Sequence, residues 1–560
     1  MERIWLNEYA PGIPAKIPPS GHASLRDLLE AGFAQFGARS AYQNMGVSLS
    51  YGRLDVLSRD LAAFLQHRGL EKGDRVAIML PNVLQYPIAL CAVLRAGLVA
   101  VNVNPLYSPR ELRHQLADSG ASAIVIMENF AATLEAVLDD TAIATVITTE
   151  LGDLFPPPKR LLTNFVVKRV RKLVPPFGIP QRIGFLKALR RGKPMPLQRV
   201  DIAPEDLAFL QYTGGTTGLA KGAMLSHRNM VANVQQSCAW LGNALGHDED
   251  IIAITALPLY HIFSLEGNCL SIMYLGGMSV LITNPRDFPA FVKELKRHRF
   301  TYFTGVNTLF SALLATPGFD SLDFSGLKIT IGGGMAVTEA VAKRWKEVTG
   351  NTLTQAYGLT ETSPAAVINP LTPGAEFNRS IGLPISSTEV SIRDDDGNEL
   401  PLGEIGEICI RGPQVMEGYW QNDEETRKVM FGDWLRTGDM GRMDERGYVF
   451  VEDRKKDMIV VSGFNVYPNE IEDVVASLHG VLEAAVIGVP DERSGEAVKL
   501  FVSRSDLTLT VETVMSHCRQ HLTGYKRPKQ IEFREELPKT NVGKVLRRAL
   551  REESSNSTAR

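Results

Sequence analysis

The first 150 residues alternate short apolar runs with longer segments of mixed character. Residues 75–80, 98–103 and 123–126 are apolar runs of the length expected for buried strands. The intervening residues 88–96 and 109–118 are expected to form helices. Strands that alternate with helices in this way predict an open α/β sheet covered by helices.

The same alternation resumes at residues 206–212 and continues past residue 380. Between residues 388 and 451 the pattern changes to short strands and turns, which is typical of a small β subdomain. We therefore expect an α/β fold class with a large N-terminal domain, residues 1–455, built of α/β subdomains and a small β subdomain. Residues 456–560 would follow as a small α+β C-terminal domain.

The C-terminal domain has its own pattern of elements. A strand at 458–461 precedes a helix with Pro468 in its first turn, a position that proline fits. A hairpin is expected around residues 491–495. A helix with an apolar face that begins at Val511 and a last strand near residues 531–533 complete the domain.

Composition narrows the class of protein. The chain has 560 residues, 44% of them hydrophobic and 22% charged, as in ordinary soluble proteins of more than one domain. The net charge of −3 gives no sign of a nucleic-acid partner.

The five cysteines lack the spacing of a zinc site, and the first residues lack the features of a signal peptide. Residues 251–283 are apolar but interrupted by polar residues, Glu266 among them, so that they cannot span a bilayer. We expect a cytoplasmic protein.

The clearest chemical motif is Tyr-Thr-Gly-Gly-Thr-Thr-Gly-Leu-Ala-Lys-Gly at residues 212–222, directly after a predicted strand. Glycines let backbone N–H groups approach a polyphosphate, hydroxyls donate further hydrogen bonds, and the lysine supplies positive charge. The predicted ATP-binding residues of this loop are Thr213, Gly214, Gly215, Thr216, Thr217, Gly218 and Lys221. A Walker loop is the main alternative, but it needs Gly-Lys-Ser/Thr at a helix start, whereas here the next helix is expected to begin at Ser226.

Four further motifs follow in order. They are Tyr-Gly-Leu-Thr-Glu at 357–361, Thr-Gly-Asp at 437–439, Asp-Arg-Lys-Lys-Asp at 453–457 and Pro-Lys-Thr-Asn-Val-Gly-Lys at 538–544. Each alone is weak, since similar runs are common in turns and on charged surfaces. Together with the Gly/Thr-rich loop they resemble the adenylate-forming enzymes: acyl-CoA synthetases, beetle luciferases and the adenylation domains of peptide synthetases. The resemblance covers nearly the whole chain and implies ATP, Mg²⁺ and an acyl-adenylate intermediate.

The resemblance implies roles that the residues can support chemically. Glu361 offers a hard oxygen ligand for magnesium, a role that it would share with Thr217, although an acid near a helix start is common without a metal. Tyr357 would stack against adenine. Asp439 can accept two hydrogen bonds from ribose hydroxyls, and Arg454 would contact the ribose or the phosphates. The remaining residues implied around adenine are Gly333, Gly334, Gly358 and Thr360.

Lys544 is the residue expected to promote adenylation, with Glu361 and Thr217 as its catalytic partners. Attack of a carboxylate on the α-phosphate brings two anions together, and a placed ammonium stabilises the resulting transition state. The resemblance also implies that the C-terminal domain is mobile and rotates about Lys456 after adenylation. In the rotated arrangement the CoA tunnel would be lined by Ser462, Gly463 and Phe464.

A closer likeness indicates the acid and the acceptor. Residues 257–263, 304–308 and 462–470 look like the corresponding stretches of bacterial long-chain fatty-acid–CoA ligases. The expected substrates are therefore a fatty acid, ATP and CoA. The acyl pocket would be bordered by His261, Gly305 and Gly332. A buried structural role is the alternative for the histidine.

Four other functions share some of these features. A medium-chain or aryl acid–CoA ligase, or an acyl-AMP ligase that loads a carrier protein, would have the same motifs. A luciferase-like oxygenase is disfavoured because the chain follows the ligase pattern closely. A non-catalytic fatty-acid-binding or uptake protein of the same fold is disfavoured because the five charged residues of the motifs are intact. These are Lys221, Glu361, Asp439, Arg454 and Lys544.

Residues 159–193 stand out because they contain eleven basic residues and no acidic one. A helix over residues 159–174 would place apolar side chains on one side and most of the basic ones on the other. Such an element can rest on anionic lipid, which suits an enzyme that takes fatty acids from a membrane. We expect peripheral contact with the cytoplasmic face of the inner membrane, with a solvated insertion or a homodimer contact as the alternatives.

Overall fold

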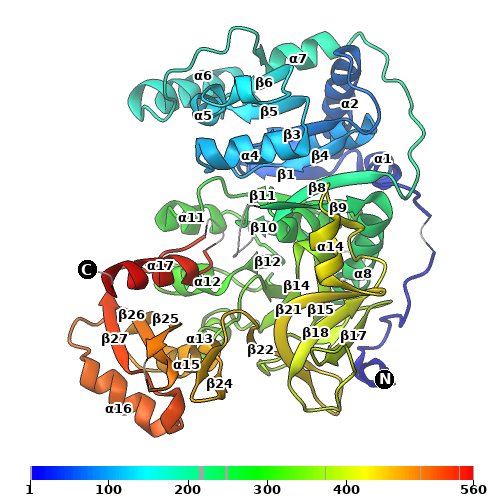
Figure 1. The fold of residues 1–560 in the computed structure, drawn as a ribbon. Helices are drawn as coiled ribbons and strands as arrows, with labels where there is room; N and C mark the ends of the chain where they lie inside the picture. The colour runs from blue at the N-terminus through cyan, green and yellow to red at the C-terminus, as the bar shows by residue number, and fades with distance from the viewer. Residues whose placement is uncertain are drawn as a thin grey trace.

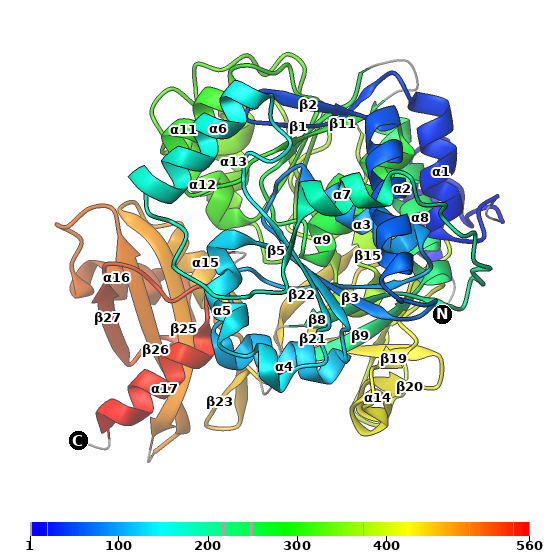
Figure 2. The same ribbon diagram turned by 90° about the horizontal axis from the view of Figure 1, so that it is seen from above.

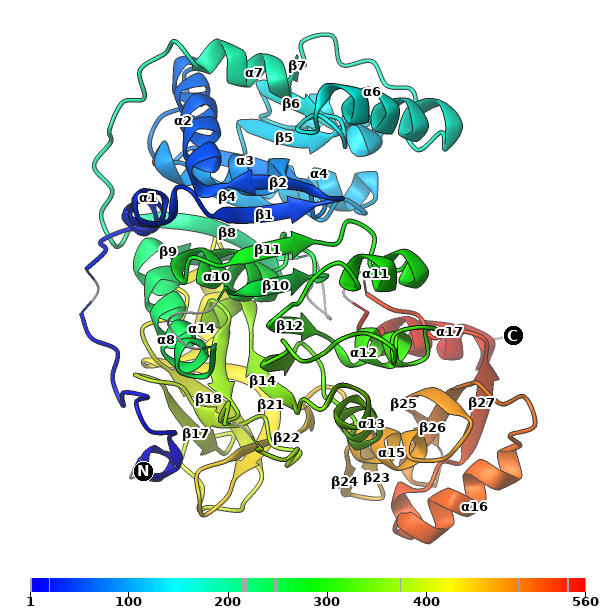
Figure 3. The same cartoon turned by 180° about the vertical axis from the view of Figure 1, so that it is seen from behind.

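A computed structural model describes residues 3–19, 21–213, 220–245, 250–372, 374–491, 493–540 and 543–558. Figure 1 shows a large domain, coloured blue to yellow, and a C-terminal domain in orange and red. In Figure 3 the C-terminal domain lies beside α12 (Asn307–Leu314) and α13 (Glu339–Thr349) of the large domain. The expected mixed α/β architecture with a smaller C-terminal domain is therefore confirmed.

An eight-stranded sheet contains most of the N-terminal elements. Its strand order is β19-β9-β8-β4-β3-β5-β6-β7, and the strands from β8 to β7 run parallel. The strands are β3 (Arg75–Met79), β4 (Val99–Asn102), β5 (Ala123–Met127), β6 (Thr145–Thr149), β7 (Ile183–Gly184), β8 (Leu207–Thr213), β9 (Lys221–Ser226) and β19 (Gly418–Tyr419). The strands predicted from the apolar runs are all present.

The helices predicted between these strands are present as well. They are α3 (Gln85–Arg95) and α4 (Pro109–Ser119). Ser108 caps α4 through a capping box with Glu111, which satisfies backbone donors at the helix start. Helix α8 (His227–Leu245) begins directly after Ser226, as expected. The other helices before α8 are α1 (Leu25–Phe36), α2 (Tyr51–His67), α5 (Ala131–Glu135), α6 (Pro157–Phe165) and α7 (Phe185–Gly192).

A nine-stranded sheet forms the second layer, in the order β16-β15-β14-β13-β12-β10-β11-β1-β2. The strands are β1 (Ser40–Asn44), β2 (Val47–Ser50), β10 (Ile252–Thr255), β11 (Met278–Leu281), β12 (Tyr302–Gly305), β13 (Ile329–Gly332), β14 (Leu353–Gly358), β15 (Ala365–Ile368) and β16 (Leu383–Pro384). Short helices near it are α9 (Ile262–Ser264), α10 (Ser271–Tyr274) and α11 (Phe288–Leu295).

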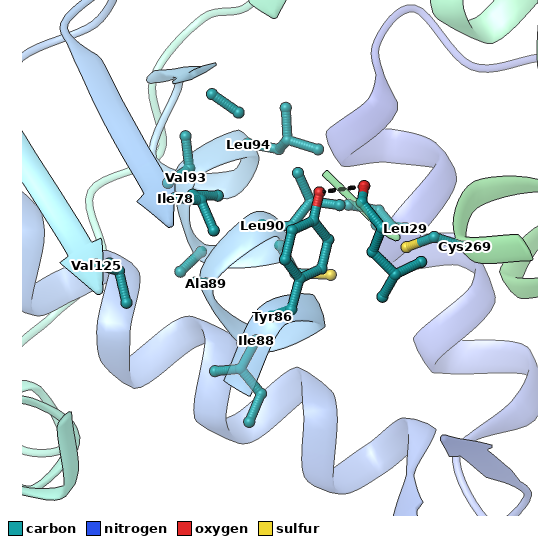
Figure 4. Packing of buried hydrophobic residues seen from close by; sticks show 14 of the residues in the cluster. Leu29, Ile78, Tyr86, Ile88, Ala89, Leu90, Val93, Leu94, Val125 and Cys269 are labelled. Carbon is teal, nitrogen blue, oxygen red and sulfur yellow. Dashed lines mark hydrogen bonds between the residues drawn. The ribbon is translucent and has the colours of Figure 1, made fainter. Parts of the chain in front are cut away.

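One hydrophobic core joins the two layers. Figure 4 shows Tyr86 of α3 packed among Ile78, Leu90 and other apolar side chains, with Cys269 close by. Cys269 belongs to the π-helix η5 (Leu265–Leu270), which follows α9. Burial of this continuous apolar surface fixes the second sheet against the first.

The predicted small β subdomain is present after residue 388. Its strands are β17 (Glu389–Arg393), β18 (Gly406–Arg411), β20 (Met430–Phe431), β21 (Trp434–Met443) and β22 (Val449–Arg454), with α14 (Asp423–Val429) before β20. Strand β19 lies outside this sheet and pairs with β9, so that Tyr419 faces Ala223 in register. This pairing brings residues far apart in the sequence to the edge of the first sheet.

The C-terminal domain has the predicted α+β pattern. Its strands are β23 (Ile459–Val461), β24 (Phe464–Val466), β25 (Val481–Asp491), β26 (Gly495–Arg504) and β27 (Gln530–Arg534), and its helices are α15 (Pro468–Ala476), α16 (Val511–His521) and α17 (Arg547–Thr558). Seen from above in Figure 2, this domain lies to one side of the large domain. Among the described residues no helix is both long and apolar enough to cross a membrane.

Candidate active site

A cavity of about 1670 Å³ lies where the two domains meet. It is lined from the large domain by residues at the carboxyl ends of the parallel strands of the second sheet, the position where open α/β sheets bind ligands. The C-terminal domain contributes Lys544 and residues around it. The predicted site residues that line the cavity are Thr213, Lys221, His261, Gly333, Gly334, Tyr357, Gly358, Thr360, Glu361, Asp439, Arg454, Lys456 and Lys544.

The Gly/Thr-rich loop connects β8 to β9 at one edge of the cavity. Thr213 at the end of β8 faces Lys221 at the start of β9 in register. The predicted residues Gly214, Gly215, Thr216, Thr217 and Gly218 lie outside the described residues. The two ends of the loop are therefore placed beside the cavity by an antiparallel hairpin.

Lys221 forms an ion pair with Glu425 of α14. Hydrogen bonding by Lys221 and then by Lys428 lowers the pKa of Glu425 to about 2, so its carboxylate stays ionised. The Lys221 ammonium also lies over the Tyr419 ring, 5.2 Å from its centroid. Glu425 and Tyr419 both lie in the segment after β18, and neither contact was predicted from the sequence.

Glu361 lies in the short 3₁₀-helix Thr360–Thr362, which follows β14. The Tyr419 hydroxyl donates a hydrogen bond to its carboxylate Oε1 at 2.6 Å. Tyr419 therefore contacts both the predicted metal ligand and the predicted phosphate-binding lysine. No pattern in the sequence indicated this role, because it depends on the pairing of a two-residue strand with β9.

Tyr357, Asp439 and Arg454 form one connected group. The Tyr357 hydroxyl donates to Asp439 Oδ2 at 2.5 Å, and Arg454 Nε lies 2.6 Å from Asp439 Oδ1. Asp439 and Arg454 are cross-strand neighbours of β21 and β22. Three residues expected around adenine and ribose are thus brought together, with an aromatic ring beside a carboxylate that can bind hydroxyl groups.

Lys544 lies among charged groups of both domains. Burial and the positive charge of Arg454 lower the pKa of Lys544 to about 8. The loop that carries it is anchored to the large domain, since the Thr308 hydroxyl donates to the Gly543 carbonyl at 3.3 Å. The positive φ of 85° at Gly543 lets the backbone pass close to Thr308. The catalytic lysine predicted from the sequence therefore faces the cavity.

The predicted hinge and CoA-tunnel residues lie in different places. Lys456 lines the cavity between β22 and β23, and burial lowers its pKa. Ser462, Gly463 and Phe464 lie at the turn between β23 and β24 and are not among the lining residues. The exposed Phe464 ring stacks on Tyr525 with centroids 4.9 Å apart.

The predicted glycines differ in their relation to the cavity. Gly333 and Gly334 line it, and a Cβ atom at Gly333 would lie 3.0 Å from Cε1 of Phe263. Gly305 and Gly332 face each other at the ends of β12 and β13 but do not line the cavity. At Gly332 a Cβ atom would lie 2.6 Å from Val337, so this glycine allows the layer behind the cavity to pack closely.

His261 is the N-cap of α9, and its Nδ1 accepts a hydrogen bond from the Phe263 N–H at 3.4 Å. Burial lowers the pKa of His261 to about 4, so the ring is neutral at physiological pH. The side chain lines the cavity, yet it can offer only a neutral polar contact to a substrate carboxylate.

The sequence matches two family descriptions in order. Residues 29–420 match the AMP-binding enzyme family, and residues 470–544 match the AMP-binding enzyme C-terminal domain. This chain belongs to the AMP-binding enzyme family. The resemblance to adenylate-forming enzymes inferred from the five motifs is thereby confirmed.

Relatives within the AMP-binding enzyme family match along the full chain. The long-chain-fatty-acid–CoA ligase of Escherichia coli O6:H1 is 54% identical over 555 residues, with 99% of each chain covered. The ligase of the same name from Yersinia pestis is 55% identical over 554 residues, with 99% of this chain and 98% of the relative covered. A solved structure of the anthranilate CoA ligase AuaEII with anthranoyl-AMP has a TM-score of 0.85 at 26% identity, and covers 96% of this chain and 98% of that chain.

Proposed function

We propose that this protein is a long-chain fatty-acid–CoA ligase that works through an acyl-adenylate. In the first step the fatty-acid carboxylate attacks the α-phosphorus of ATP and pyrophosphate leaves. In the second step the CoA thiol attacks the acyl carbon and AMP leaves. The observation that carries the proposal is the convergence of Lys221, Glu361, Asp439, Arg454 and Lys544 on one cavity.

For the first step we assign nucleotide binding to the large domain and charge stabilisation to Lys544. Asp439 would bind the ribose hydroxyls, and the Tyr357 ring beside it would contact adenine. Lys221 and the Gly/Thr-rich loop would bind the phosphates. The Lys544 ammonium would stabilise the negative charge that develops at the α-phosphate when the two anions meet.

Magnesium fits the proposed site. Mg²⁺ is usually held by one or two carboxylates together with substrate phosphates, and Glu361 supplies a carboxylate on the cavity wall. Glu361, with Thr217 as the second proposed ligand, would hold the ion, which neutralises phosphate charge when bound. The hydrogen bond from Tyr419 keeps the Glu361 carboxylate oriented.

For the second step we propose that the C-terminal domain rotates about Lys456. The turn that contains Ser462, Gly463 and Phe464 would then replace the Lys544 loop beside the large domain and line the CoA tunnel. Support comes from the position of Lys456 between β22 and β23, and from the exposure of the Phe464 ring outside the present cavity.

Two assays test the proposed reaction. Acid-dependent exchange of pyrophosphate into ATP measures the first step, and consumption of the CoA thiol measures both steps. Lys544→Ala should abolish most of the exchange, whereas the variant should still transfer the acyl group from preformed acyl-adenylate to CoA. Near-normal exchange in Lys544→Ala would contradict the assigned role, and no exchange in the wild type would favour a non-catalytic binding protein.

The acid and the acceptor need their own comparison. Saturated acids of graded length and an aryl acid should be offered with CoA, and a carrier protein should replace CoA in parallel. We expect the highest kcat/KM for long-chain acids with CoA. A maximum at medium-chain or aryl acids, or acyl transfer only to the carrier protein, would assign the chain to one of the other adenylating functions.

We also propose that the region around α6 contacts a membrane. Five apolar side chains on α6 and after it are between 56% and 66% exposed: Leu161, Leu162, Phe165, Val170 and Leu173. The face turned to the protein is polar instead. Asn164 accepts from the Gly152 N–H at 2.8 Å, and Lys168 lies 2.6 Å from Glu128. An amphipathic element with its apolar side outward suits a lipid surface.

The neighbouring cations support an anionic lipid. Arg169, Arg171 and Lys172 are exposed beside the apolar residues, and each cation near such a surface contributes about 1 kcal/mol. In Figures 1 and 3 α6 projects from the side of the molecule. Helix α7 differs, since its Phe185 and Leu189 are buried and α7 packs on α2.

Flotation with vesicles that contain anionic lipid tests this contact at low and high salt. The double variant Leu161→Ser, Phe165→Ser should lose binding, while a matched change on the exposed side of α7, Lys187→Ser, should lower it only slightly. Equal flotation of all three proteins would refute contact through α6, and elution of the wild type as a dimer that the double variant cannot form would favour a homodimer contact.

A further inference from the structure

A carboxyl group lies buried in the cavity wall. Glu266 belongs to η5, and only 3% of its surface is exposed. It lines the cavity together with Gly267 and Tyr302. None of the nucleotide-binding roles assigned above uses it. Insertions of a π-helical turn are frequent at functional sites.

Glu266 lies on the route that an acyl chain would follow away from the nucleotide. The Phe263 ring connects the two regions, because a Cβ atom at Gly333 would lie 3.0 Å from its Cε1 and one at Gly267 would lie 3.9 Å from its ring carbons. Leu241 and Ile331, apolar residues of the cluster against which Phe263 packs, also line the cavity. A chain that passes Gly333 along this ring therefore reaches Gly267 and its neighbour Glu266.

The carboxyl group lies in a cluster of polar side chains. Burial raises the pKa of Glu266 to about 7, and hydrogen bonding with Ser271 offsets this rise only in part. The Ser271 hydroxyl donates to Glu266 Oε1 at 2.5 Å. Within the part of the chain that the structure describes, no cation pairs with Glu266. A protonated carboxyl can both donate and accept a hydrogen bond.

Tyr302 adds a second polar group at the same place. Its side chain is 1% exposed, and a Cβ atom at Gly267 would lie 3.4 Å from its hydroxyl oxygen. No hydrogen bond joins this hydroxyl to another of the described residues. An unsubstituted acyl chain here would leave the buried Tyr302 hydroxyl without a hydrogen-bond partner, which is unfavourable.

We propose that Glu266 and Tyr302 form a subsite that binds an oxygen substituent, a hydroxyl or keto group, on the acyl chain. The inference rests on the proposed function, because it requires an acyl chain in this cavity. A hydroxyl group there accepts from one partner and donates to the other. A site built to bind such a group discriminates against the analogue that lacks it.

The test is a positional series of saturated long-chain acids of one length, each with a single hydroxyl at a different carbon. The readout is kcat/KM for each hydroxy acid divided by that for the unsubstituted acid, so losses common to both acids cancel. In the wild type we expect a maximum of this ratio at one or two adjacent positions. Glu266→Met, which has a similar length and no polar group, should lower the maximum roughly tenfold.

Three further measurements make the test decisive. Glu266→Gln retains a donor and an acceptor and should preserve most of the maximum, and Tyr302→Phe should lower it. Ser311→Ala removes a hydroxyl elsewhere on the cavity wall and serves as the matched control. A flat positional profile, or the same profile in the wild type and Glu266→Met, would overturn the subsite, as would a larger preference for an amino-substituted chain. These results leave the proposed function standing if the unsubstituted acid is still converted, whereas failure to adenylate any acid would refute the proposed function itself.

Discussion

Arg547 of the C-terminal domain and Asp453 of the large domain form an ion pair across the boundary between them, with Nη1 2.9 Å from Oδ1. Asp453 is fully buried on the last strand before Lys456, and its other oxygen accepts the Asn469 N–H at 2.7 Å. Arg547 also pairs with Glu472 inside its own domain. One carboxylate of the large domain therefore binds two elements of the C-terminal domain in the orientation that presents Lys544 to the cavity.

Asp453→Asn should slow adenylation by roughly tenfold or more, because it removes the charge opposite a buried guanidinium. The second step should be affected much less if it uses the rotated arrangement proposed above, in which Asp453 and Arg547 separate. Pyrophosphate exchange and single-turnover transfer from synthetic acyl-adenylate to CoA measure the two steps. Arg551→Gln, which breaks a pair with Asp457 inside the C-terminal domain, is the control. Equal losses in both steps would mean that Asp453 serves only stability.

Gly543→Ala should impair the first step selectively. The new Cβ would lie 2.6 Å from the Thr308 hydroxyl oxygen. Alanine would also have to keep the left-handed φ of Gly543, which costs a residue other than glycine about 1 to 2 kcal/mol. Both effects push the Lys544 loop away from the cavity, so exchange should fall about tenfold while thioester formation from acyl-adenylate is retained. Thr308→Ala alone removes the hydrogen bond that anchors the loop and should cause a smaller loss. In the double variant the contact is absent, so the combined loss should be less than the sum of the two. Fully additive losses would show that the contact with Thr308 does not displace the loop.

The main residues of the candidate site could be proposed from the sequence because each lies in a local motif. Asp439 and Arg454, for example, come from separate motifs that β21 and β22 place side by side. Tyr419 and Glu425 could not be predicted. Their contacts with Glu361 and Lys221 depend on the pairing of the short strand β19 with β9, which no local pattern indicates.

The sequence also did not show which side of a helix or which side chain would face the rest of the protein. The helix predicted over residues 159–174 is present in part, as α6 followed by the π-helix Val166–Val170. Its two-sided pattern did not indicate that the polar side, through Asn164 and Lys168, would face the protein. In the sequence, Glu266 was noted only because it interrupts an apolar segment. Its position in the cavity wall depends on how η5 packs, which the sequence did not indicate.

Glu425→Gln should lower the KM for MgATP, because the Glu425 carboxylate occupies the Lys221 ammonium that we assign to the phosphates. The pKa of about 2 means that this competition is present at every working pH. Both side chains of the pair remain partly accessible to solvent, which weakens the ion pair, so the change in KM should be modest, about two- to fivefold. Glu424→Gln, which removes the neighbouring pair with Lys428 only, is the matched control. A raised KM in Glu425→Gln would show instead that Glu425 orients Lys221 for ATP.

The rate of adenylation should fall as the pH rises through about 8. In its proposed role Lys544 acts as an ammonium. Burial and Arg454 lower its pKa to about 8, so the active form is complete below this pH and lost above it. Because kcat/KM reports groups of the free enzyme, the profile of exchange against pH should show this descending limb. Lys544→Arg should be slower, since the guanidinium has another shape, but its rate should stay level to roughly pH 9.

Lys456 also has a lowered pKa, so Lys456→Arg is the discriminating control. Persistence of the limb in Lys456→Arg and its loss in Lys544→Arg would assign the titration to Lys544, and the reverse would assign it to the proposed hinge.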